Sequence, residues 1–232
     1  VPGHATAAQI TKLDAIATTG YVNGLKFEYV SATSISCSTG SAEIESSGVQ
    51  LVVASPITVS SLNLSAWTWY HCYLYNNNGT PAIEVSATAP AAPYFGVARS
   101  KTGDTTRRYL FSIFSNVSGY VCNFQHAPTT GYVAWLVPVF DVLVDGRATS
   151  YTSFGVYAPV TSRLAFLNCV NTNATYNAYL KTADAAGDMF IFYPGVRLGL
   201  AFPLNASQDV QYKMGAAVQG FYSNTPGYWF DR

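Results

Sequence analysis

Carboxylates are the first side chains in this sequence that could do chemistry, and they are few. Glu43 and Glu45 lie two residues apart, a spacing that places both side chains on one face of a strand. Such a pair could act as general acid and base on a glycoside. A pair like this is more often a solvated strand face, and that is the interpretation we favour.

Four aspartates could group around a calcium ion, but none has the spacing of an EF-hand loop. These are Asp141, Asp145, Asp184 and Asp188. We expect turn and capping roles for them, with residues 184–188 forming a hairpin turn. The sequence also lacks a nucleophile elbow, a P-loop and a G-x-G-x-x-G motif. The sequence therefore predicts no catalytic residue, no metal site and no cofactor.

The histidines and cysteines are widely spaced, at positions 4, 71 and 126 and at positions 37, 72, 122 and 169. No CxxC pair provides a zinc signature. His71 and Cys72 lie in an aromatic, strand-like run, so a structural histidine and a buried thiol are expected there. No export signal is visible, which favours free structural thiols over two disulfides.

The composition excludes several classes of protein. Of 232 residues only 10% are charged, 15% are aromatic, and 12 Lys+Arg balance 12 Asp+Glu. A neutral chain without a basic run is not expected to bind nucleic acid. The apolar content is too high for a disordered chain, and no apolar run approaches the ~18 residues of a membrane span. So little charge favours extracellular exposure or burial of surface in an oligomer.

One helix is expected, near the N-terminus. Thr6 is a plausible N-cap with Gln9 as its capping-box partner, and Ile10, Leu13, Ile16 and Ala17 form one apolar stripe. About three turns of helix are unstable alone in water. We therefore expect these four residues to pack against copies of the same helix.

From Gly24 onward, strand and turn signals alternate as in antiparallel all-β proteins. Strands are expected over 25–30, 67–75, 107–114 and 209–221, and a short hairpin over 33–44 around Ser38–Gly40. A linker at 126–131 divides the chain. The expected fold is all-β, with a helical segment over 1–24 and two antiparallel, β-sandwich-like domains over 25–128 and 129–232.

Several segments resemble the tail fibres of tailed phages. Residues 6–16, TAAQITKLDAI, are similar to the fibre segment T/S-A-A-x-x-x-K-L-D-G/A-I. Residues 69–124 contain, in order, WYHCYLY, NGT, SATAPAAP, RRYL and SGYVCNF, which resembles a fibre module W-x-x-V-Y-L, G-T, S-x-x-A-P-x-x-P, R-R-I-G, S-G-x-I-x-x-F. Tyr-Leu replaces Ile-Gly at 109–110. Residues 142–150 resemble the opening of a β-sandwich-like tip.

The resemblance implies the distal, receptor-binding part of a tail fibre: a homotrimer, part of the virion, assembled in the bacterial cytoplasm. It implies adhesion rather than enzymatic activity, with no membrane insertion. The implied partners are further copies of the chain and a bacterial surface polysaccharide or outer-membrane protein. The alternatives are a structural virion component, such as a fibre connector or capsid decoration, and a fragment of a polysaccharide-depolymerising tailspike.

Two segments are the candidate receptor contacts: the polar loop 171–177, which contains one Tyr, and the aromatic, turn-rich segment 221–229. Tyrosine offers rigid contact area at low entropic cost, and Asn adapts its hydrogen bonds. The candidate residues are Asn171, Asn173, Tyr176, Tyr222, Asn224, Tyr228 and Trp229. For Tyr228 and Trp229 we favour the alternative of packing in a core or a subunit interface.

Overall fold

The computed structural model describes residues 19–136, 140–218 and 220–232, and its regular elements there are all strands. The expected all-β class is confirmed, with several antiparallel sheets. The expected helix, with Ile10, Leu13, Ile16 and Ala17, lies outside the described residues. Within them, no helix is long and apolar enough to cross a bilayer.

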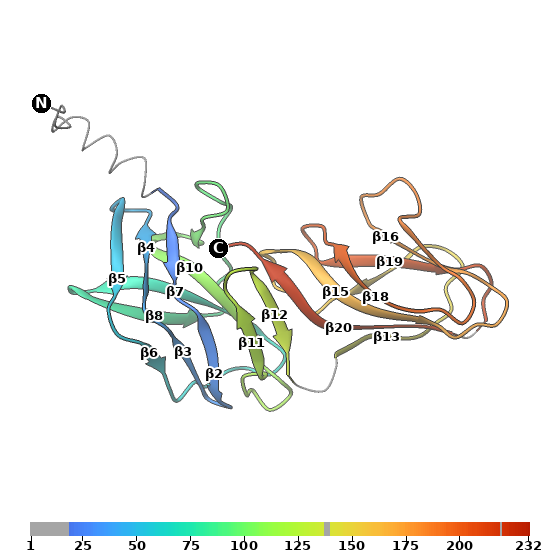
Figure 1. Cartoon of the computed structure of the whole chain (residues 1–232), viewed down its shortest axis with the longest axis horizontal. Helices are drawn as coiled ribbons and strands as arrows, with labels where there is room; N and C mark the ends of the chain where they lie inside the picture. Colours follow the sequence, from blue (N-terminus) through green and yellow to red (C-terminus); the bar gives the residue numbers. More distant parts are fainter. Residues whose placement is uncertain (1–18, 137–139, 219) are drawn as a thin grey trace, which may run out of the picture. The chain divides into compact units, whose positions relative to one another are not determined.

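The chain divides into two compact units (Figure 1). Unit 1 contains the described residues up to Cys122 together with Arg232, and unit 2 contains Asn123–Asp231. The expected boundary between residues 128 and 129 lies further along, in the turn between the first two strands of unit 2. Arg232 donates hydrogen bonds to the carbonyls of Leu25 and Gly24, both at 2.9 Å.

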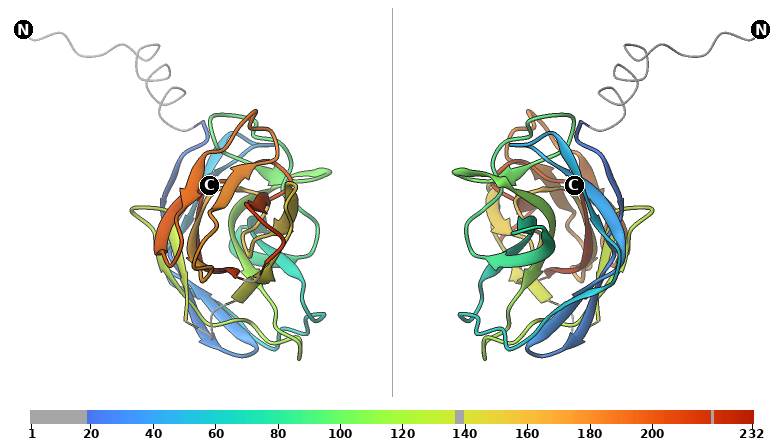
Figure 2. Two further views of the ribbon diagram at one scale, coloured as in Figure 1. Left: turned by 90° about the vertical axis from the view of Figure 1, so that its right-hand side faces the viewer. Right: turned by 90° about the vertical axis from the view of Figure 1, so that its left-hand side faces the viewer.

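Unit 1 is built from three groups of antiparallel strands. The first is β1 (Val22–Gly24), β4 (Gly40–Ile44) and β5 (Val49–Val53); the second is β2 (Phe27–Ser31), β3 (Ser34–Cys37) and β6 (Ile57–Val59). The third is β8 (Thr80–Ser86), β7 (Trp69–Asn77), β10 (Asp104–Phe114) and β9 (Ser100–Lys101). In both views of Figure 2, the blue strands of unit 1 lie opposite its teal and green strands.

The core of unit 1 lies between these layers. Phe27 on β2 stacks on Phe111 of β10, with ring centroids 4.9 Å apart. Cys72, Tyr73 and Leu74 on β7 have no exposed surface. The apolar run expected as the strongest strand is therefore the centre of the unit's core.

The β7–β8 hairpin has the turn that its sequence predicts. Asn77 pairs with Thr80, which leaves Asn78 and Gly79 as the two turn residues. Both have positive φ, 50° and 92°. An Asn-Gly pair tolerates this left-handed backbone and matches the twist of the flanking strands.

The prediction of a hairpin around Ser38–Gly40 is wrong. β3 pairs with β2 and β6, whereas β4 pairs with β1 and β5, so the chain changes sheets between them. The backbone is crowded at this crossing, because a Cβ on Gly40 would lie 2.3 Å from the carbonyl oxygen of Asn23. Glycine is therefore needed for the close approach of two strands, not for a hairpin turn.

Unit 2 has two sheets. One contains β18 (Arg197–Pro203), β15 (Ser162–Asn171), β20 (Phe221–Phe230), β12 (Tyr132–Trp135) and β11 (Phe124–Ala127), with β13 (Phe140–Gly146) also paired to β20. The other contains β14 (Thr152–Gly155), β19 (Asp209–Met214), β16 (Ala178–Thr182) and β17 (Phe190–Phe192). Phe192 and Tyr212 of the second sheet pack on Phe221 of the first, at 5.3 and 6.0 Å between ring centroids.

The C-terminal part of unit 2 differs from expectation. The strand expected over 209–221 ends at Met214, and the turn-rich segment expected at 221–229 is the ten-residue strand β20. The ladder between β15 and β20 is irregular between Phe166 and Asn168, where Pro226 lies without a partner in the register. A β-bulge accommodates a residue that has no N–H to donate.

His71 on β7 is a buried structural residue, as expected. Its Nδ1 lies 2.8 Å from the hydroxyl of Ser112, and burial lowers the pKa of His71 to about 4. The cysteines are also buried and unpaired in the structure. Burial raises the pKa of Cys37 and Cys169 to about 12, which keeps them as unreactive thiols at neutral pH.

Acid is expected to destabilise the protein through His71. The unfolded chain protonates this histidine near pH 6.5 and the folded chain near pH 4, so stability falls as the pH drops between these values. The full loss is about 3 kcal/mol. Urea unfolding at a series of pH values measures it. The variant His71→Gln is neutral throughout and should flatten the dependence of the unfolding free energy on pH between pH 6.5 and 4. If that dependence is unchanged in the variant, a group other than His71 causes it.

Candidate functional site

The candidate residues of β20 lie along a central strand and not on a loop. Tyr228 is fully buried and packs on Trp135, with ring centroids 5.6 Å apart. Trp229 is half-buried and lies 4.6 Å from the ring of Tyr132. Tyr228 therefore belongs to the core of unit 2.

Tyr222 and Asn224 lie near the other end of β20. Both are half-buried, opposite Val170 and Asn168 of β15 respectively. Tyr222 is close to the loop that follows β15, because its neighbour Phe221 pairs with Asn171. The seven candidates consequently do not form one surface. Asn171, Asn173 and Tyr176 form a group by themselves.

Asn171, at the end of β15, organises that group. Its side chain is fully buried, and Nδ2 donates to the main-chain carbonyls of Tyr176 at 2.9 Å, Phe192 at 3.0 Å and Tyr193 at 3.3 Å. Its Oδ1 accepts from the backbone N–H of Asn173 at 3.1 Å. One buried amide thereby holds two segments that are far apart in the sequence.

Further hydrogen bonds hold the loop that follows β15, residues 172–177, in one conformation. The side chain of Asn173 accepts from the backbone N–H groups of Thr175 and Tyr176, both at 2.8 Å. Its carbonyl accepts from the N–H of Gly195 at 3.1 Å, which joins the two loops directly. Asn is well suited to such turns because its short side chain can accept hydrogen bonds from the backbone N–H groups two or three residues further along.

The two loops present Tyr176 and Tyr193 to solvent. Their side chains are 42% and 62% exposed, although the main-chain carbonyls of both residues bind the same amide nitrogen. Tyr176 is in the segment that the sequence indicates, whereas Tyr193 is not among the candidates. The signal for it is Tyr193-Pro194-Gly195 after an apolar strand, because Pro-Gly marks an exposed turn.

The outer face of the second sheet of unit 2 carries a charged aromatic cluster. Lys213 Nζ lies 4.6 Å from the ring centre of Tyr151, 4.7 Å from that of Tyr179 and 3.3 Å from Asp188. Asp188 also accepts a hydrogen bond from the hydroxyl of Tyr151. These charges bind each other, which indicates a structural cluster rather than a site awaiting a ligand.

Glu43 has a structural role as well. The prediction that Glu43 lies on a solvated strand face is wrong, because this residue is only 4% exposed. Its carboxylate accepts hydrogen bonds from the N–H of Gly20 and the hydroxyl of Tyr94. Its strand, β4, is buried on both faces at Ala42–Ile44, so alternation does not separate inside from outside there. Residues 183–189 connect the antiparallel strands β16 and β17, as expected for the 184–188 turn. Over 19–136, 140–218 and 220–232, His, Cys, Asp and Glu form no group of three suited to a metal ion.

No protein-family model matches the chain, and no curated protein is similar enough to count as a match.

Proposed function

We propose that this chain is the distal, receptor-binding part of a phage tail fibre, which attaches the virion to a glycan of the bacterial surface. In this proposal the segment 1–24 trimerises, through Ile10, Leu13, Ile16 and Ala17, and the two units are its β-sandwich-like domains. Its contact with the glycan is made by Tyr176 and Tyr193. The chain acts by adhesion, without catalysis or a cofactor.

The tail-fibre part of this proposal rests on the resemblance of residues 6–16 and 69–124. The observation that supports the proposed glycan contact most is the buried amide of Asn171. Exposed tyrosines on unrestrained loops would lose conformational freedom on binding, which weakens affinity. Here three hydrogen bonds from one side chain hold both loops in place before any ligand arrives. A pair of exposed aromatic rings on a rigid backbone is suited to stacking on the C–H face of a sugar.

Trimerisation would compensate for the small size of such a site. Two tyrosines bury little area, so a single site is expected to be weak. Three sites on one fibre end, and several fibres on one particle, raise the effective concentration after the first contact by orders of magnitude. A native mass near 75 kDa, three times the 25.0 kDa of the chain, is the expected result of light scattering; a mass near 25 kDa would contradict the trimer.

Loss of the two rings is expected to abolish attachment to cells. The double variant Tyr176→Ala/Tyr193→Ala removes both aromatic contacts and leaves the hydrogen bonds of Asn171 intact, because these go to main-chain carbonyls. Truncation of each aromatic anchor costs about 1–2 kcal/mol per site, so monovalent affinity should fall at least about tenfold. Binding of labelled protein to a panel of bacterial strains, measured by flow cytometry, tests this.

Tyr120→Ala is the matched control, because Tyr120 is 48% exposed but lies in unit 1. It should bind as the unmodified chain does. Equal binding of the double variant would exclude this tyrosine pair as the contact. Absence of binding of the unmodified chain to every strain would instead favour a structural role in the virion.

A further inference from the structure

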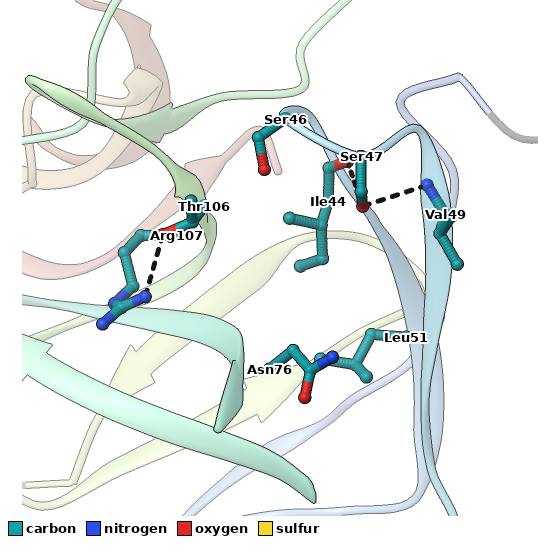
Figure 3. A pocket seen from close by; sticks show the side chains of 8 residues that line it. All are labelled: Ile44, Ser46, Ser47, Val49, Leu51, Asn76, Thr106 and Arg107. Carbon is teal, nitrogen blue, oxygen red and sulfur yellow. Dashed lines mark hydrogen bonds between the residues drawn. The ribbon is translucent and has the colours of Figure 1, made fainter. Parts of the chain in front are cut away.

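A cavity of about 410 Å³ opens on unit 1 beside the β4–β5 hairpin (Figure 3). Ile44, Val49 and Leu51 of the hairpin strands line one side of it, and Thr106 and Arg107 of β10 lie across the open space. The hairpin is fixed relative to β10, because the N–H of Ser46 donates to the carbonyl of Thr105 at 3.2 Å. The cavity is therefore part of the fold.

The polar groups of the cavity lie around its apolar side. Ser46 in the hairpin turn contributes a hydroxyl and Arg107 a guanidinium. Asn76 near the end of β7 contributes only its Nδ2 group, because its Oδ1 accepts from the N–H of Gly79 at 2.6 Å. The hydroxyl of Ser47 binds the carbonyl of Ile44 and the N–H of Val49, so it shapes the turn instead. An apolar surface with a few polar groups at its edge is typical of small-ligand sites, and volumes of about 300–1,000 Å³ are usual for them.

Arg107 is held in position before any ligand binds. Its guanidinium lies 3.9 Å from the ring centre of Tyr75, Nε donates to Glu84 at 2.7 Å, and Nη1 donates to the hydroxyl of Thr106 at 2.9 Å. Guanidinium has five N–H groups, and these two bonds use two of them. Nη2 has no hydrogen-bond partner within the described part of the chain. Arg107 therefore keeps unused N–H donors at the edge of the cavity.

The charges around Arg107 compensate one another. Glu84 binds both Arg107 and Lys101, and Asp104 lies 3.9 Å from Arg107 Nε. Two cations and two anions leave no net charge beside the cavity. Such a site would gain little from an anionic ligand, and it favours a neutral ligand with many hydrogen-bonding groups.

We infer that this cavity binds one neutral pyranose residue of a glycan. The C–H face of the sugar packs on Ile44 and Leu51, and its hydroxyls bind Ser46, Asn76 and Arg107. This second sugar site is in a different unit from Tyr176 and Tyr193 and does not depend on the function proposed for them. A ligand of this size in an open cavity is expected to have a Kd on the order of 1 mM.

Titration of the whole 15N-labelled chain with methyl glucopyranoside, methyl galactopyranoside and N-acetylglucosamine tests the inference by NMR. Saturable shifts of the backbone amides of Ser46, Leu51, Asn76 and Thr106 with at least one of these sugars are expected. Ser46→Leu, at an exposed turn position, should raise the Kd at least tenfold. Ser55→Leu, an exposed loop position of the same unit, should leave it unchanged.

Three results would overturn the inference. The first is that none of the three sugars shifts these amides, and the second is that Ser46→Leu binds as tightly as Ser55→Leu. The third is binding of glucuronate alone, weakened by salt, which would indicate an anion site. Failure of this site leaves the cell-binding experiment with Tyr176 and Tyr193 unaffected, and failure of that experiment does not alter the titration.

Discussion

Replacement of Arg108 by methionine is expected to lower the free energy of unfolding of unit 1 by about 3–5 kcal/mol. Arg108 has no exposed surface, although it carries a charge. It donates from Nη1 to the carbonyl of Arg99 at 3.2 Å and from Nη2 to the carbonyl of Gly20 at 3.1 Å. Methionine would fill similar space but donate neither bond.

Glu43 is the reason why the loss is large. Burial lowers the pKa of Arg108, whereas the charges of Tyr94, Glu43 and Glu45 act in the opposite direction. Glu43 binds the N–H of the same Gly20 whose carbonyl Arg108 binds. Without Arg108, the buried carboxylate of Glu43 would have no compensating cation, and an unpaired buried charge is strongly unfavourable.

Urea unfolding, monitored by hydrogen exchange of the backbone amides of unit 1, measures this effect. The double variant Glu43→Gln/Arg108→Met should lose less stability than the two single variants added together, because it leaves no unpaired charge. Arg197→Met, at an exposed position of unit 2, is the control and should change stability by less than about 0.5 kcal/mol. A loss below about 1 kcal/mol for Arg108→Met would contradict the role assigned to the buried charges.

Replacement of Asn171 by aspartate is expected to destabilise unit 2 by about 4 kcal/mol and to abolish attachment to cells. Aspartate has nearly the same shape, but its carboxylate cannot donate. In the unmodified chain, the two N–H groups of the Asn171 amide are shared among the carbonyls of Tyr176, Phe192 and Tyr193. In the variant, the carboxylate would face these carbonyl oxygens instead. The carbonyl of Tyr193 keeps the N–H of Val196 at 3.2 Å, so the loss falls on the carbonyls of Tyr176 and Phe192. Each buried carbonyl left without a donor costs about 1–3 kcal/mol.

Asn177→Asp provides the matched control. It adds the same charge to the same loop at a half-buried position, and it leaves the hydrogen bonds of Asn171 intact. Thermal unfolding and the flow-cytometric binding assay should both distinguish the two variants. If Asn171→Asp unfolds and binds as Asn177→Asp does, the buried amide does not position the two tyrosines.

The local sequence was sufficient where one residue pair or one alternating run decides the structure. Asn78-Gly79 predicts its hairpin because few other pairs tolerate two positive φ angles in succession. The aromatic run around His71 and Cys72 predicts a buried strand, because apolar side chains on both faces exclude exposure to water. In β19, Val210, Tyr212 and Met214 alternate with polar residues, which shows the inward face directly.

The tertiary structure decided every feature that depends on contacts between distant residues. The chain's turn signals do not distinguish a hairpin at Gly40 from a crossing between sheets, because the close approach of Asn23 is not local. Pro226-Gly227 by itself indicates a turn, but pairing with β15 keeps this segment in a strand, and a bulge in β20 accommodates the proline. Likewise, Glu43 is buried and Tyr193 lies beside Tyr176 only because partners far along the chain bind them. Alternation determines which side chains share a face, but the energy of burying a polar group depends on partners that only the fold brings within reach.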